Sequence, residues 1–212
     1  MSKIKLKVCG MKDPDNIKAV LGLKPELMGF IFYQGSPRFV GSAFAIRDSD
    51  ESTKRVGVFV NEGTQEIMKE VRNHKLDFVQ LHGAEAVVQC GELKEQGVGV
   101  IKAFSVDDYM NFGVTSDFHS VVDYFLFDTK GKYHGGNARR FNWQVLSRYD
   151  QKTPFFLSGG ITPDHIDEIR LLQNYNLYAI DVNSGVESAA GYKDVEKIRS
   201  IQAKLNIKHL TS

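Results

Sequence analysis

Cysteine and long apolar runs are both scarce in this chain. Cys9 and Cys90 are the only cysteines among its 212 residues, too few for the disulfide framework of a small secreted protein. The first residues, MSKIKLK, lack the apolar segment of a secretory signal, and no run approaches the roughly 18 apolar residues of a membrane span. We therefore expect a cytoplasmic protein without a membrane partner.

An excess of charge and metal-binding motifs are missing as well. The formal net charge is +1, so no global field attracts nucleic acid, and an anionic ligand would need a local site. The six histidines are scattered, and none lies in a CxxC or HExxH arrangement. The sequence therefore predicts a protein that binds no nucleic acid and needs no metal.

What the chain does contain is a regular alternation of short apolar runs and amphipathic helical patterns. Several of the runs are continuous, as in strands buried on both faces of a parallel sheet. Strands are predicted at residues 3–9, 28–33, 55–60, 78–82, 98–104, 123–128, 154–158 and 178–182. Helices are predicted at residues 14–22, 42–51, 64–74, 85–95, 107–112, 142–149, 163–174 and 193–205. Eight such units, in a chain long enough for one sizeable core, predict a single (β/α)8 barrel domain over residues 1–212.

The alternative fold is an open, doubly wound sheet. Such a sheet calls for a glycine-rich phosphate loop after its first strand, where this chain has only Gly10. In a barrel, by contrast, the carboxyl ends of all the strands meet on one face. Polar residues at those ends are therefore the candidates for function.

The loops after the last two predicted strands are rich in glycine. Gly159 and Gly160 follow the seventh strand, and Asn183, Ser184 and Gly185 follow the eighth. Glycine allows backbone N–H groups to approach an anion closely, and these two loops are the usual phosphate site of a barrel. We expect a phosphorylated ligand here, although the same glycines could simply form tight turns.

Cys9 closes the first predicted strand and alternates with Lys5 and Lys7 on one face of it. If the intervening apolar residues pack outward, Cys9 points into the mouth of the barrel. A thiol has a reference pKa of about 8.5, so modest positive potential would make it a base or nucleophile near neutral pH. The alternative is an inert core cysteine, which is how we interpret Cys90 on its apolar helical stripe.

Asp128 ends the apolar run of the sixth predicted strand, where its carboxyl group could donate a proton. Its alternative role is that of a turn residue. Arg38 lies in a loop and could present a planar fork to a substrate carboxylate, unless it is only a solvated side chain. The segment 130–140 is long for a βα loop and is either a lid or a plain surface loop.

Taken together, short segments in a fixed order resemble the phosphoribosylanthranilate isomerase family. They are KVCG at 7–10, GFIF at 29–32, SPR at 36–38, VGVFVN at 56–61, VQLHG at 79–83, FDT at 127–129, FNW at 141–143, LSGG at 157–160 and DVNSGVE at 181–187. Single pieces are weak, but the ordered set covers essentially the whole chain. The resemblance implies a phosphate-binding (β/α)8 barrel.

The resemblance also implies an activity: the Amadori rearrangement of N-(5′-phosphoribosyl)anthranilate in tryptophan biosynthesis, by acid–base catalysis without a cofactor. The partner is then a small phosphorylated sugar–anthranilate substrate, and the protein is a monomer or a homodimer. By the family's pattern Cys9 is the general base and Asp128 the general acid. The implied substrate-binding residues are Arg38 for the anthranilate carboxylate, His82, Asp181 near the amine and hydroxyls, and Gly159, Gly160, Asn183, Ser184 and Gly185 for the phosphate.

Two departures and two alternatives accompany the resemblance. The family's lid commonly reads GGTG, whereas residues 135–138 read GGNA, so Ala138 would change the motion of the lid. The second departure is Ala190 in place of a proline, and we expect this change in a turn to have no effect on function. The histidine-pathway aldose–ketose isomerase is the alternative enzyme, but it uses two aspartates, and Cys9 argues against it. The alternative from another class is a phosphate-sugar-binding barrel without catalysis.

Overall fold

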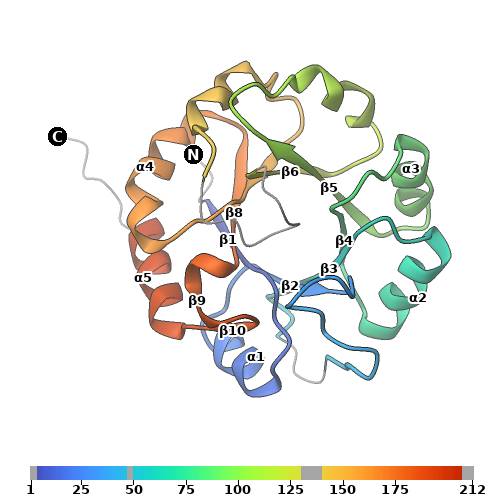
Figure 1. Ribbon diagram of the computed structural model, residues 1–212, viewed down its shortest axis with the longest axis vertical. Coiled ribbons are helices and arrows are strands. Elements are labelled where there is room, and N and C mark those ends of the chain that lie inside the picture. The colour runs from blue at the N-terminus through green and yellow to red at the C-terminus, as the bar shows by residue number, and fades with distance from the viewer. Residues whose placement is uncertain (1–3, 47–49, 130–139, 207–212) are drawn as a thin grey trace.

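The structure is a computed structural model that describes residues 4–46, 50–129 and 140–206. Eight parallel strands close into a barrel in sequence order, which confirms the predicted (β/α)8 fold, and Figure 1 looks down that barrel. The barrel closes where the first strand pairs with the last, with Lys7 opposite Asp181. The strands are β1 Lys5–Val8, β2 Leu27–Ile31, β3 Lys54–Phe59, β4 Phe78–Leu81, β5 Gly99–Val106, β6 Tyr124–Thr129, β7 Phe155–Leu157 and β8 Leu177–Val182.

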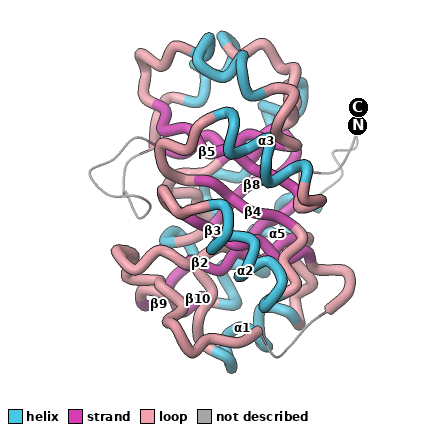
Figure 2. The backbone as a smooth tube through the Cα atoms, turned by 90° about the vertical axis from the view of Figure 1, so that its right-hand side faces the viewer, coloured by secondary structure: helices cyan, strands magenta, loops and turns pink. Residues whose placement is uncertain are grey.

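Helices surround the strands, as the side view in Figure 2 shows. The α-helices are α1 Pro14–Leu21, α2 Thr64–His74, α3 Val87–Glu95, α4 Ile166–Arg170 and α5 Val195–Asn206. Short 3₁₀ helices complete the ring: η1 Phe112–Phe118, η2 Trp143–Arg148, η3 Pro163–His165, η4 Leu171–Asn174 and η5 Ser184–Val186. A small hairpin of β9 Glu187–Ala189 and β10 Tyr192–Lys193 lies beside α1.

Local sequence explains where helix α1 begins. Asp13 precedes it in an extended conformation, and its carboxylate accepts a hydrogen bond of 2.9 Å from the backbone N–H of Asn16. Pro14 then occupies the first helical position, where a missing N–H costs nothing.

The core has two layers separated by the sheet. The strand residues that face outward join the helices in one large cluster, which includes Leu6 and Val8. The residues that face inward fill the barrel, among them Leu27, Val56, Leu126 and Phe156. The alternation of β1 therefore sends Cys9, next after Val8, to the inner face, as predicted.

Two predicted helices are wrong. Between β2 and β3, the described part of 42–51 forms turns and no helix. Phe44 and Ile46 each pack against the core, and a spacing of two residues suits an extended chain better than a helix. The helix predicted at 107–112 is replaced by η1, which starts at Phe112 because Asn111 caps it with a hydrogen bond from Gly113 N–H.

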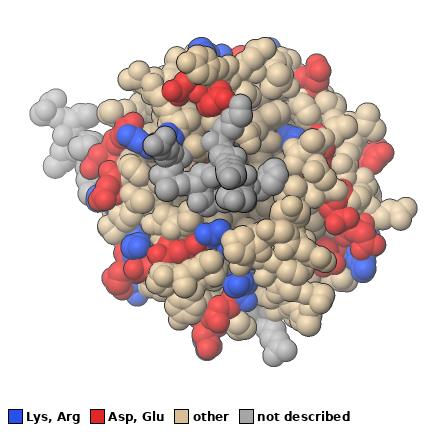
Figure 3. Space-filling model, in the orientation of Figure 1, with Lys and Arg blue, Asp and Glu red and all other residues tan. Residues whose placement is uncertain are grey.

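Charges of both signs are mixed over the face of the molecule seen in Figure 3. Among the described residues, no helix has the length and apolarity needed to cross a membrane. In the same residues, no group of three or more His, Cys, Asp and Glu side chains comes together as a metal site would require.

Candidate active site

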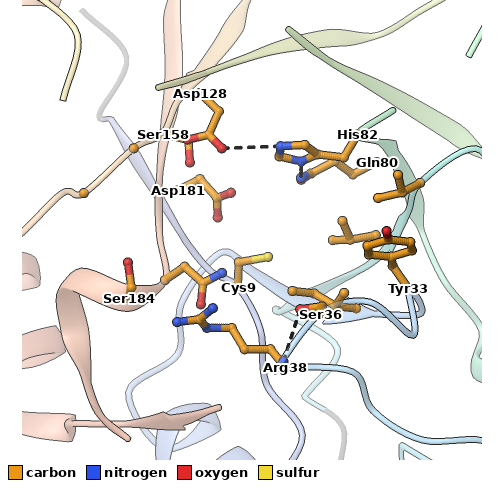
Figure 4. A pocket seen from close by; sticks show the side chains of 16 residues that line it. Cys9, Tyr33, Ser36, Arg38, Gln80, His82, Asp128, Ser158, Asp181 and Ser184 are labelled. Atoms are coloured by element: carbon orange, nitrogen blue, oxygen red, sulfur yellow. Dashed lines mark hydrogen bonds and ion pairs between the residues drawn. The ribbon is translucent and has the colours of Figure 1, made fainter. Parts of the chain in front are cut away.

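A pocket opens at the carboxyl ends of the barrel strands, with an empty volume of about 680 Å³ that includes its open mouth. Figure 4 shows that side chains from both halves of the barrel point into it. Every predicted site residue lines this pocket except Gly185. The lining consists of Cys9, Ile31, Tyr33, Ser36, Arg38, Val58, Val60, Gln80, His82, Asp128, Ser158, Gly159, Gly160, Asp181, Asn183 and Ser184.

Gly185 serves another purpose, because it lies against the loop that follows β7. A Cβ atom at this position would collide with the backbone carbonyl of Ile161. The absence of a side chain therefore lets the two glycine-rich loops approach each other. Gly159 and Gly160 both have positive φ angles, of 103° and 65°, which favour glycine.

Cys9 lies at the floor of the pocket and is 3% exposed. Gly29 on the neighbouring strand makes room for the thiol, since a Cβ there would stand 2.7 Å from its sulfur. Burial raises the pKa of the Cys9 thiol, and the nearby Lys7 ammonium opposes that rise without cancelling it. The positive potential expected from the sequence is present, but desolvation is the larger effect.

Lys7 supplies that positive charge from inside the barrel, where it is fully buried. Its ammonium lies 2.9 Å from the Asp181 carboxylate and donates a hydrogen bond of 2.8 Å to the Gln80 side-chain oxygen. Burial disfavours the charged amine, but attraction to the Asp181 carboxylate and the Cys9 sulfur together outweighs burial, and the pKa of Lys7 is raised. Lys7 and Asp181 therefore form a buried ion pair, of which Asp181 lines the pocket.

Asp128 is the last residue but one of β6, lies on another side of the pocket and is 7% exposed. Its Oδ1 accepts the backbone N–H of Thr129 at 2.9 Å, and its Oδ2 lies 3.3 Å from Nε2 of His82. Both contacts hold the carboxyl group in one orientation at the rim. His82 follows β4 and connects in turn to Gln80, whose amide nitrogen is 2.9 Å from the imidazole Nδ1.

Arg38 also reaches the pocket, but its planar fork is engaged by Glu187. Nε and Nη2 of the guanidinium donate to the two carboxylate oxygens at 2.8 and 2.6 Å. Lys193 Nζ and the Gly191 N–H bind the same carboxylate, at 2.5 and 3.0 Å. Burial alone would raise the pKa of Glu187, but these cations and donors lower it to about 2.

The polar residues of the site that were missed from the sequence are Lys7 as a site residue and Gln80, then Glu187 and Lys193 next to Arg38, and finally Tyr33, Ser36 and Ser158 in the pocket lining. A usable signal existed for the first two, since a charged or polar residue at an inward position of an apolar strand must find a buried partner. Glu187 and Lys193 lie on the hairpin beyond β8, and no pattern in the sequence placed that hairpin at the pocket. The predicted lid falls mostly on residues 130–139, outside the described part of the chain.

Comparison with known proteins agrees with this architecture. A family model for N-(5′-phosphoribosyl)anthranilate (PRA) isomerase matches residues 6–204. The N-(5′-phosphoribosyl)anthranilate isomerase of Parabacteroides distasonis is 42% identical over 199 residues, which cover 92% of this chain and 90% of that protein. The enzyme of the same name from Phocaeicola vulgatus is 40% identical over 189 residues, with 89% and 91% covered.

Solved structures give the same result. The crystal structure of phosphoribosyl anthranilate isomerase from Thermotoga maritima matches with a TM-score of 0.83 at 27% identity, covering 95% of this chain and 98% of that one. A second isomerase structure, in complex with reduced 1-(o-carboxyphenylamino)-1-deoxyribulose 5-phosphate, has a TM-score of 0.78 at 26% identity, with 95% and 98% covered. With its closed barrel, its lined pocket and these relatives, the chain belongs to the N-(5′-phosphoribosyl)anthranilate isomerase family.

Proposed function

We propose that Cys9 and Asp128 are the general base and general acid with which this isomerase rearranges N-(5′-phosphoribosyl)anthranilate. The observation that carries the proposal is that both side chains line one pocket, from the ends of β1 and β6. A substrate between them can receive a proton from one group and give a proton to the other.

The reaction begins at Asp128. Its carboxyl group protonates the furanose ring oxygen, the bond from that oxygen to C1′ breaks, and an iminium cation forms between C1′ and the anthranilate nitrogen. The hydrogen bonds from Thr129 N–H and His82 to the Asp128 carboxylate stabilise the negative charge that the departing proton leaves behind.

Cys9 completes the rearrangement. As the thiolate it removes the C2′ proton, and the electrons of that bond neutralise the iminium to give an enolamine. Tautomerisation to the ketone moves a proton from the C2′ hydroxyl to C1′, so that product and substrate have the same composition. Because burial raises the pKa of Cys9, the thiol form is favoured before the reaction. The iminium cation then favours the thiolate by Coulomb attraction, and the thiol proton passes to solvent at the open mouth of the pocket. The C2′ proton restores the thiol, and Asp128 regains a proton from solvent after the turnover.

The remaining polar groups bind the two anionic ends of the substrate. The loops that carry Gly159, Gly160, Asn183, Ser184 and Gly185 take the phosphate. Arg38 takes the anthranilate carboxylate. Since Nε and one hydrogen of Nη2 bind Glu187, Nη1 and the second Nη2 hydrogen remain for the substrate.

Asp181, held by Lys7 at 2.9 Å, faces the substrate amine and hydroxyls. A solved relative contains a reduced form of the corresponding product, which supports a pocket of this chemical character. A solved relative from Thermotoga maritima is a dimeric enzyme of which monomers were made. For this chain, a monomer or a homodimer stays a prediction, as does a cytoplasmic location.

Two variants test the proposal when they are assayed by the loss of substrate fluorescence without added metal. Cys9→Ser and Asp128→Asn should each lower kcat by about 100-fold or more, while the affinity for the product changes little. Substrate loss at the normal rate in either folded variant would remove that residue from its proposed role.

A further inference from the structure

A chain of polar contacts starts at Lys7, runs through three residues of the pocket wall and links the two sides of the site. Lys7 Nζ donates to Oε1 of Gln80 at 2.8 Å, and Nε2 of Gln80 lies 2.9 Å from Nδ1 of His82. Nε2 of His82 then lies 3.3 Å from Oδ2 of Asp128. Gln80 is 1% exposed and Lys7 is fully buried, so water does not compete for this part of the chain. Figure 4 shows Gln80 beside the His82 ring, and His82 joined to Asp128.

The direction of each hydrogen bond follows from the donors available. An ammonium group can only donate, so the carbonyl oxygen of the Gln80 amide must face Lys7. The amide NH₂ group therefore faces His82, and it too can only donate. Nδ1 of His82 must accept that hydrogen bond, and an imidazole that accepts at Nδ1 carries its proton on Nε2, where it faces Asp128.

We propose that Gln80, oriented by Lys7, is a positioning residue that fixes His82 as the neutral Nε2–H tautomer and so reserves the Asp128 proton for the substrate. This inference rests on the proposed role of Asp128 as the general acid. With Nε2 protonated, His82 donates to the carboxylate that remains after proton transfer. In the opposite tautomer, a lone pair at Nε2 would accept the Asp128 proton and hold it away from the substrate.

The charges around His82 show why such a constraint is needed. Asp128 faces the ring at 3.3 Å, and Asp181 lies close enough to interact with both Asp128 and His82. This negative charge does not by itself select which ring nitrogen carries the proton. Lys7 makes the selection through Gln80, because an Nδ1–H would point at the hydrogens of the amide. A further titratable group on this side of the site is the Cys9 thiol, which interacts with Lys7.

The sharpest perturbation is Gln80→Glu, which keeps the size of the side chain and turns the donor into an acceptor. The new carboxylate can still bind Lys7, and it accepts a hydrogen from Nδ1 of His82. We expect His82 to become an imidazolium or the Nδ1–H tautomer, and kcat to fall by about 10-fold or more with KM nearly unchanged. Gln65→Glu, an exposed position on α2, is the matched control for the same chemical change.

The tautomer is read directly from the ¹⁵N chemical shifts of the imidazole ring in protein labelled at histidine, with His82 assigned by the loss of its signals in His82→Asn. The wild-type spectrum should show an unprotonated Nδ1 and a protonated Nε2 at neutral pH. A wild-type His82 that is Nδ1–H or an imidazolium overturns the inference. The tautomer itself is read from the wild-type protein, and the folded His82→Asn variant serves only to assign the signals.

Activity measurements test separately whether the His82 tautomer matters for catalysis. Gln80→Met removes the donor without adding a charge, so the ¹⁵N shifts of His82 should show protonation at Nδ1 in part of the molecules, and kcat should fall with it. Normal kcat in a folded Gln80 variant whose His82 spectrum has changed overturns the link to catalysis. The proposed role of Asp128 is judged by Asp128→Asn alone, so a failure of that role is distinguishable from a failure of this inference.

Discussion

Glu187 offers a quantitative test of the electrostatics around the pocket. Its side chain is 7% exposed and binds both Arg38 and Lys193, which lower its pKa from an ordinary 4.5 to about 2. One pKa unit corresponds to about 1.4 kcal/mol, so the charged form contributes on the order of 3 kcal/mol to folding at neutral pH. Glu187→Gln keeps the shape of the side chain and removes this contribution.

The pH dependence has a definite sign. A carboxyl group whose pKa is lower in the folded state stabilises the protein fully above its unfolded pKa, and the contribution is lost as pH falls towards the folded pKa. The difference in unfolding free energy between wild type and Glu187→Gln should be about 3 kcal/mol at pH 7, about 2 kcal/mol at pH 3.5 and about 1.4 kcal/mol at pH 3.

Urea unfolding at these pH values measures the difference. The matched control is Glu168→Gln, because Glu168 pairs with Arg140 on the surface, where the two side chains are 49% and 38% exposed. Exposed ion pairs contribute little to the free energy of unfolding, so Glu168→Gln should lower that free energy by less than about 1 kcal/mol. A Glu187→Gln loss that is no larger than the control's, or that stays constant between pH 7 and pH 3, would refute the reasoning.

Three further substitutions separate binding from chemistry. Cys9→Ser should lower kcat by about 100-fold or more at unchanged product affinity, because a hydroxyl is a much weaker base than a thiolate; single-turnover assays and product titration measure the two effects. Asp128→Asn should also reduce kcat steeply with little change in thermal stability; lost stability with normal activity per folded molecule would mark a structural turn residue. Arg38→Ala should raise KM about 10- to 150-fold by removing a charge-assisted contact; if wild type and variant discriminate equally against an analogue without the ring carboxylate, Arg38 does not bind that group.

The barrel could be predicted because its strands are buried on both faces. Runs such as Tyr124–Phe127 are apolar throughout, and this pattern, repeated eight times with helical segments between, has few solutions other than a closed parallel sheet. The region between β2 and β3 could not be predicted in the same way. There Phe44 packs against Phe30 with a ring-centroid distance of 5.6 Å, so tertiary contacts rather than helical propensity set the conformation.

The pocket was predicted to the extent that its residues end strands. Cys9, Asp128 and Asp181 lie where three strands finish, and the barrel brings their ends together. Glu187 is the first residue of β9 and meets the site through Arg38, which comes from the loop after β2 and lines the pocket. Such a pairing, across 149 residues of sequence, depends on how two loops fold over the barrel and leaves no periodic trace.

The buried charges of this site form two clusters in which one group contacts more than one partner. Lys7 balances Asp181 and orients Gln80, while Lys193 and Arg38 balance Glu187 on the neighbouring side. Burying an unpaired charge in a medium of low polarity costs free energy, so each of these charged groups holds its partner in position. An iminium cation about 4 Å from the Cys9 sulfur would be worth roughly 4 kcal/mol at an effective dielectric constant near 20, or about three pKa units. This attraction opposes the rise in the Cys9 pKa that burial causes. On the proposed mechanism, we therefore expect ring opening by Asp128 to be the step that prepares Cys9 to act as a base.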